Sequence, residues 1–114
     1  MPRARVVVLS IFNLPAMWDA VKSLSAATSA RNLCISATDR DRPLLVRAVR
    51  DLNQQLASVC GRHPNCRYDG GAAYHLRWRR PDISTVGYFH PSLSGQRNIA
   101  AALWATGAFL PTKR

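Results

Sequence analysis

The chain has 114 residues, 47% of them hydrophobic, so it can form one domain or part of one, and this composition argues against global disorder. The formal net charge is +10, but every basic residue except Lys22 and Lys113 is an arginine, and the arginines are spread along the whole chain. We interpret this charge as scattered surface arginine and keep a binding site for nucleic acid or an anionic membrane as the alternative.

The first predicted element is a short buried strand within "RVVVLSIF". Half of its residues are β-branched, and a turn at Asn13-Leu14-Pro15 ends it. The apolar run at residues 6–12 reaches only the lower length limit of a signal-peptide core, and no convincing cleavage site follows. No segment approaches the ~20 apolar residues of a membrane span.

Two helices are predicted next. A short one follows the turn, with Trp18, Val21 and Leu24 on one face, and residues 25–42 then read as an irregular connection. The clearest helix begins near Pro43, with Asp39 and Asp41 placed to complement its N-terminal end, and stops at Gly61. Its spacing predicts one apolar face, made of Leu45, Val49, Leu52, Leu56 and Val59.

The three cysteines leave several arrangements open. Cys60 and Cys66 are six residues apart across a turn and could close a small loop, which would leave Cys34 without a partner in this chain. Three reduced, buried cysteines are the alternative. None of the spacings is typical of a zinc site, so we expect no metal.

The C-terminal half begins with a predicted short strand in "NCRYDGGAAY", which ends in a turn at residues 69–71. Residues 75–90 read as a long surface loop, in which "RWRRP" could contact nucleic acid if Trp78 stacks on a base; we favour a substrate-side or solvated loop. Ser92 or Ser94 can cap a last helix, which ends at Gly107. We expect its buried stripe to be Ile99, Ala100, Leu103 and Trp104, and we also expect Trp18 to lie in the core.

This order of elements is typical of an α/β protein, with few strands for a complete sheet. The segments "VVVLSIFNLPAMWDAV", "LNQQLASVC", "CRYDGGAAY" and "DISTVGYFHPSLSGQRNIAAALW" occur in the order found in the C-terminal half of actinobacterial SGNH hydrolases, the GDSL lipases and esterases. The chain resembles that family over roughly residues 4–107, within a single partial domain at 1–114. The resemblance implies part of a flavodoxin-like, three-layer α/β/α sandwich, with the site at the C-terminal edge of a parallel sheet.

The most specific block is "STVGYFHPSLSGQRNIA", where the family has a D-x-x-H-P sequence that supplies its catalytic acid and base. By this resemblance His90 is the general base, and Gly87 occupies the position of the acid. The missing carboxylate matters, because loss of the equivalent aspartate in serine proteases lowers kcat roughly 10⁴-fold. The Gly87 carbonyl could orient the imidazole instead, and Asp82 is a weaker substitute because it lies five residues earlier.

The family's nucleophile and oxyanion-hole motifs, G-D-S and G-x-N-D, do not occur in this sequence. Ser10 lacks a glycine elbow, and Ser84, Ser92 and Ser94 read as turn and cap residues. The resemblance therefore implies the base-bearing half of a serine ester hydrolase, inactive alone, whose other half a longer reading frame or a complementing chain would supply. The alternative is a small basic protein that binds anionic partners without catalysis.

Further expectations follow from the resemblance. The substrate would be an ester or lipid, and no cofactor is implied. Family members of this type are secreted and disulfide-bonded. This chain, however, has no convincing signal peptide and would stay in the cytoplasm as encoded. If its cysteines are oxidised as in the family, one of the three would need a partner before Met1. We also expect self-association through apolar faces at residues 6–8 and along the predicted helix from Pro43, because half of a sandwich leaves these faces uncovered. His63 and His75 are expected at the surface, and nucleic acid is not favoured as a partner.

Overall fold

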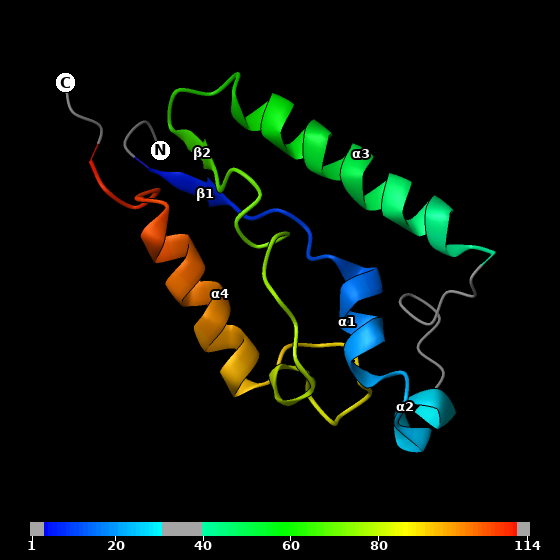
Figure 1. Ribbon diagram of the computed structural model, residues 1–114. Coiled ribbons are helices and arrows are strands. Elements are labelled where there is room, and N and C mark those ends of the chain that lie inside the picture. Colours follow the sequence, from blue (N-terminus) through cyan, green and yellow to red (C-terminus); the bar gives the residue numbers. More distant parts are fainter. Residues whose placement is uncertain (1–3, 31–39, 112–114) are drawn as a thin grey trace.

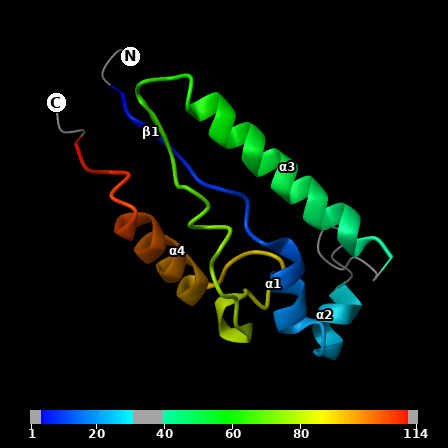
Figure 2. The ribbon, with the colours of Figure 1, turned by 45° about the horizontal axis from the view of Figure 1, so that its top comes forward.

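A computed structural model describes residues 4–30 and 40–111 as a mixed α/β structure (Figure 1). Two strands, β1 (Val6–Val8) and β2 (Cys66–Tyr68), pair in parallel, with Val6 opposite Cys66 and Val8 opposite Tyr68. Parallel strands need a long crossover connection, and its described residues here form three helices. Figure 1 shows both strands between the long helix α3 (Arg42–Cys60) and the C-terminal helix α4 (Leu93–Ala105), and Figure 2 shows β1 between the same two helices. The predicted α/β class is confirmed.

The first two helices follow β1 directly. Helix α1 (Leu14–Val21) begins at Asn13, whose side chain accepts a hydrogen bond from the Ala16 N–H at 3.2 Å. Helix α2 (Ser25–Ala30) occupies a stretch that we expected to be irregular, so that part of the expectation is wrong. Three of its six residues are alanine, which has the highest intrinsic helix propensity, and one of them, Ala27, is buried. Residues 31–39, with Cys34 and Asp39, lie outside the described residues.

Helix α3 (Arg42–Cys60) confirms the predicted long helix and its end at Gly61. Its apolar face is only partly covered. Val49 is buried, but Leu52 and Val59 are 47% and 51% exposed. A polar residue, Asn53, faces the sheet instead: its Oδ1 accepts from the Ile11 N–H at 2.7 Å, and its Nδ2 donates to the Ile11 carbonyl at 3.1 Å. The side-chain amide thus satisfies both backbone groups of a residue beyond the end of β1.

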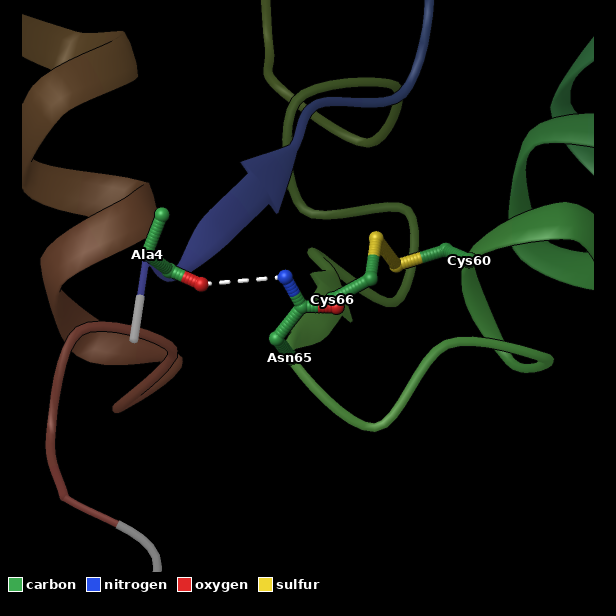
Figure 3. The surroundings of a disulfide bond; sticks show 4 residues. All are labelled: Ala4, Cys60, Asn65 and Cys66. Carbon is green, nitrogen blue, oxygen red and sulfur yellow. Dashed lines mark hydrogen bonds between the residues drawn. A yellow bond between two sulfur atoms is a disulfide. The ribbon is translucent and has the colours of Figure 1, made fainter. Parts of the chain in front are cut away.

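A disulfide joins the end of α3 to the start of β2 (Figure 3). It links Cys60 and Cys66. The sequence had left this pairing and three reduced cysteines as alternatives, and the pairing is confirmed. Beside it, the Asn65 side chain donates to the Ala4 carbonyl at 3.0 Å, and the Asn65 carbonyl accepts from the Val6 N–H at 2.9 Å. The bridge and these hydrogen bonds fix the turn from which β2 enters the sheet.

The segment after β2 is less exposed than predicted. It contains one 3-10 turn, η1 (Arg80–Asp82), and its Trp78, Asp82 and Ile83 are buried. Trp78 packs edge-to-face on Phe12, with ring centroids 5.4 Å apart, inside the main hydrophobic cluster. That cluster contains Met17, Val21, Ala27, Trp78 and Ile83. The hypothesis that Trp78 stacks on a base is therefore wrong, because its ring is enclosed by the core.

Helix α4 (Leu93–Ala105) is the last helix of the described residues, and Gly107 follows it with φ of +69°. Leu103 is buried and Ile99 packs against the core, as predicted. Ala100 is exposed, and Trp104 is 71% exposed and stacks on Phe109, with ring centroids 6.1 Å apart. The prediction of Trp104 in the core is wrong, because no described element covers this side of α4. Trp18 is partly buried against the core cluster, in line with its prediction.

Candidate catalytic loop

His90 lies on the loop that leads into α4, and its side chain is exposed. Two backbone contacts fix its position: the Ser84 N–H donates to the His90 carbonyl at 2.8 Å, and Ile83 and Pro91 form an antiparallel bridge. The imidazole packs edge-to-face on Phe89, with ring centroids 4.9 Å apart. His90 is thus exposed, as expected for the predicted surface loop, and Ser92 is the N-cap of α4, as one of the two predicted caps.

Gly87, the expected position of the acid, lies at the exposed tip of the same loop. Its φ is +76°, and Tyr88 follows with φ of +53°. This left-handed conformation suits glycine and is unfavourable for most other residues. A β-carbon at Gly87 would have no heavy atom within 4 Å, so the space around this position is open. The loop therefore has room for a side chain but a backbone that glycine adopts most easily.

Asp82 does not replace the missing acid. Its carboxylate is 1% exposed, and both oxygens are occupied by groups other than His90. Oδ1 accepts from the Ser94 hydroxyl at 2.7 Å and from the Asn98 amide at 3.2 Å, and Oδ2 accepts from the Arg79 N–H at 3.1 Å. Burial alone would raise the pKa of Asp82, but these hydrogen bonds and the Arg79 charge outweigh it and hold the pKa below its usual value. Asp82 is an anchor for the loop.

The serines near His90 serve as caps and turn residues. Ser92 Oγ donates to the Pro81 carbonyl at 2.6 Å and accepts from the Gly95 N–H at 3.2 Å. Gly95 packs so closely on η1 that a β-carbon there would lie 2.2 Å from the Asp82 carbonyl oxygen. Residues that precede His90 in the sequence thus contact residues that follow it, and these contacts hold the loop against the start of α4. Among the described residues, the imidazole itself donates no hydrogen bond to a carboxylate.

A second polar network, at the carboxyl ends of the strands, was not found from the sequence. Ser10 and Asp69 are 2% and 4% exposed, and the Ser10 hydroxyl donates to Asp69 Oδ2 at 2.9 Å. Burial would raise the pKa of Asp69, but the N–H groups of Ala73, Ser10 and Gly71 donate to it and lower the pKa below its usual value. Ser10 Oγ also accepts from the Tyr74 N–H at 2.8 Å. In the sequence, only the predicted turn at residues 69–71 pointed to this network. The network closes the carboxyl end of the sheet.

Two open cavities lie near these networks. One, of about 460 Å³, lies beside the His90 loop and is mostly apolar. The other, of about 370 Å³, lies between α3 and the turn after β2, and Arg50, Tyr68, Tyr74 and His75 line it. His63 and His75 are exposed, as expected.

Within the described part of the chain, no helix is both long and apolar enough to cross a membrane, and no three or more His, Cys, Asp or Glu side chains gather as a metal site would require. Comparison with known proteins finds no family model, curated protein or solved structure that matches this chain.

Proposed function

We propose that this chain is the base-bearing part of a serine ester hydrolase, with His90 as the general base. The observation that carries the proposal is an exposed imidazole on a loop fixed at both sides, within the block "STVGYFHPSLSGQ" that resembles the SGNH hydrolases. The same resemblance leads us to propose that the parallel pair of strands, with α3 and α4 on either side, belongs to a flavodoxin-like α/β/α sandwich. The Cys60–Cys66 disulfide favours an oxidising compartment.

The chemistry assigns one step to this chain. His90 takes the proton of a serine hydroxyl as that oxygen attacks the ester carbonyl, and then gives the proton to the leaving alcohol. The acyl-serine is hydrolysed by water through the same base. The serine and the oxyanion hole would come from a separate polypeptide segment, because the serines near His90 are engaged as caps and turn residues. Without a carboxylate beside it, His90 acts with weak orientation.

The test supplies the missing half. An N-terminal polypeptide that carries the G-D-S and G-x-N-D motifs of a serine ester hydrolase is fused ahead of this chain, and turnover of p-nitrophenyl butyrate is measured. We call this fusion the complemented enzyme. We expect turnover that His90→Ala abolishes and that His63→Ala, at an exposed histidine outside the loop, leaves intact. Turnover that survives His90→Ala, or a folded fusion with no turnover at all, would overturn the proposal.

A further inference from the structure

The cavity between α3 and the turn after β2 has aromatic side chains on one wall. Its volume is about 370 Å³, within the range of about 300–1,000 Å³ typical of small-molecule sites. A face of α3 that includes Val46 and Arg50 forms the first wall, and the second wall contains the rings of Tyr68, Tyr74 and His75. Aromatic rings pack well on other rings, so this mostly apolar cavity suits a planar aromatic ligand.

Hydrogen bonds hold the aromatic wall in place. Asp69, which is buried directly after β2, accepts from the Gly71 N–H at 2.8 Å, and the Gly71 carbonyl accepts from the His75 N–H at 2.9 Å. The Tyr74 N–H donates to Ser10 Oγ at 2.8 Å. The rings of Tyr74 and His75 pack edge-to-face, with centroids 5.1 Å apart. The backbone beneath these two rings is thus fixed to the end of the sheet.

The wall formed by α3 is fixed to the same end of the sheet. Asn53, which also lines the cavity, accepts from the Ile11 N–H and donates to the Ile11 carbonyl through its side-chain amide. Both walls are therefore formed before a ligand binds. A ligand that enters such a site orders few protein groups, which reduces the entropy lost on binding.

The charge on the cavity wall favours an anion. Arg50 is the only arginine, lysine, aspartate or glutamate among the described residues that line the cavity. Its Nε lies 3.4 Å from Asp51 Oδ1, but both side chains are more than half exposed, and an ion pair of this kind contributes little. A guanidinium can hold a carboxylate through two parallel hydrogen bonds. A carboxylate attached to an aromatic ring would combine both features of the cavity.

We propose that this cavity binds a small aromatic carboxylate, with the ring between α3 and Tyr74 and the carboxylate beside Arg50. The site is separate from the proposed catalytic loop, because α3 lies on one side of the strands and α4, which follows His90, lies on the other (Figure 1). Binding at this site goes beyond the proposed hydrolase function and does not require His90.

The test measures binding of 2-naphthoate to the full chain by NMR, with the amide signals of Gly70 and Gly71 as the readout. Binding should saturate with a Kd of about 1 mM or below, as the affinity per atom of small ligands predicts. 2-Naphthamide has the same shape without the charge and should bind about tenfold more weakly. Decahydro-2-naphthoate keeps the charge without the aromatic rings and should bind about threefold more weakly.

Arg50→Gln should weaken 2-naphthoate binding by about tenfold and leave the affinity for 2-naphthamide unchanged, because it removes only the charge that the carboxylate uses. Arg50 is exposed, so its replacement should not unfold the chain. Arg47→Gln is the matched control, since Arg47 is exposed on the same helix and does not line the cavity. It should change Kd by less than about twofold, because solvent and salt screen a charge at that distance.

His90→Ala should leave both affinities unchanged, so failure of the hydrolase proposal is distinguishable from failure of this one. Absence of saturable binding, equal affinities for 2-naphthoate and 2-naphthamide, or equal effects of the two arginine variants would overturn the proposed site. Ligand-induced shifts at Gly107, beside the exposed Trp104 and Phe109, in place of shifts at Gly70 and Gly71 would also overturn it.

Discussion

Gly87 occupies the position at which the resembling family has an acid beside the histidine, and His90 is the base that we propose. The Gly87 position has open space on the loop, but its φ of +76° is one that an L-amino acid adopts at a cost of about 1–2 kcal/mol. Aspartate and asparagine tolerate this conformation better than most residues. The loop can therefore accept the carboxylate that the resembling family has at this position, with a modest loss of stability.

We expect Gly87→Asp to raise kcat of the complemented enzyme by at least about tenfold, because a carboxylate beside the imidazole stabilises the imidazolium formed during acyl transfer. The rate of p-nitrophenyl butyrate hydrolysis measures this. Gly87→Asn has the same shape and strain without the charge and should give no gain. The 114-residue chain should gain nothing from either change. Equal rates for the Gly87→Asp and Gly87→Asn variants would mean that another acceptor already orients His90.

Asp82 supports the loop through its ionised form, so its effect on stability depends on pH. Its pKa is lowered in the folded state, which means that its contribution is fully present above the unfolded value of about 3.9 and is lost as pH falls through the lower folded value. Asp82→Asn should cost about 1–3 kcal/mol at neutral pH, because an amide NH₂ cannot accept the Arg79 N–H.

Urea unfolding between pH 7 and pH 2, followed by circular dichroism, measures this effect. The Asp82→Asn variant should lose less stability below about pH 4 than the unmodified chain, although Asp69, whose pKa is also lowered, preserves part of the acid sensitivity. Asp51→Asn removes an exposed carboxylate of α3 and should leave the curve unchanged. An acid profile of Asp82→Asn identical to that of the unmodified chain would contradict the role of this carboxylate.

Among the elements, α3 and β2 are joined covalently by the disulfide. It closes a short loop, for which the chain-entropy model gives about 2 kcal/mol of stabilisation. We expect Cys66→Ser to lower the free energy of unfolding by about this amount, measured by urea unfolding. A reducing agent should destabilise the unmodified chain equally and leave Cys66→Ser unaffected. If reduction has no effect on the unmodified chain, the bridge is not a stabilising link.

The elements show where sequence reasoning succeeds and where it fails. The position of α3, the N-cap at Ser92 and the exposure of His90 could be predicted, because proline, glycine and serine act locally on the backbone. The burial of side chains could not be predicted in the same way. The spacing placed Leu52, Val59 and Trp104 on covered faces, yet coverage depends on which other elements are present. Asn53 faces the sheet because backbone groups of Ile11 need partners, which periodicity cannot reveal.

At the scale of the whole molecule, apolar surface is left uncovered. The radius of gyration is 15.9 Å, against about 13 Å for a compact chain of this length. Large hydrophobic side chains are exposed on several elements: Val6, Leu44, Leu52, Val59, Trp104, Phe109 and Leu110. The stacked pair of Trp104 and Phe109 is the largest aromatic contribution to this surface.

We expect the chain to self-associate through Trp104, Phe109 and Leu110, because these exposed side chains lie together and contiguous apolar groups drive association. Sedimentation velocity from low to high micromolar concentration measures it. Trp104→Gln should weaken the association constant by about tenfold, since a buried aromatic anchor contributes strongly to an interface. Ala101→Gln, at an exposed position on the same helix, is the control. A monomer at every concentration with cooperative unfolding would contradict this expectation and the proposed half-domain.

The parallel pairing of β1 and β2 also has a consequence for the order in which the chain folds. Val6 meets Cys66 only after a segment containing three helices has been closed into a loop, and the entropy of that closure is lost before the strand contacts form. Helix α3 forms through local contacts, and the disulfide joins cysteines only six residues apart, so neither requires the closure of a long loop. Hydrogen exchange during refolding should therefore protect the amides of α3 first and those of Val6 and Asp69 late, and the Ser10–Asp69 network would form in that last step.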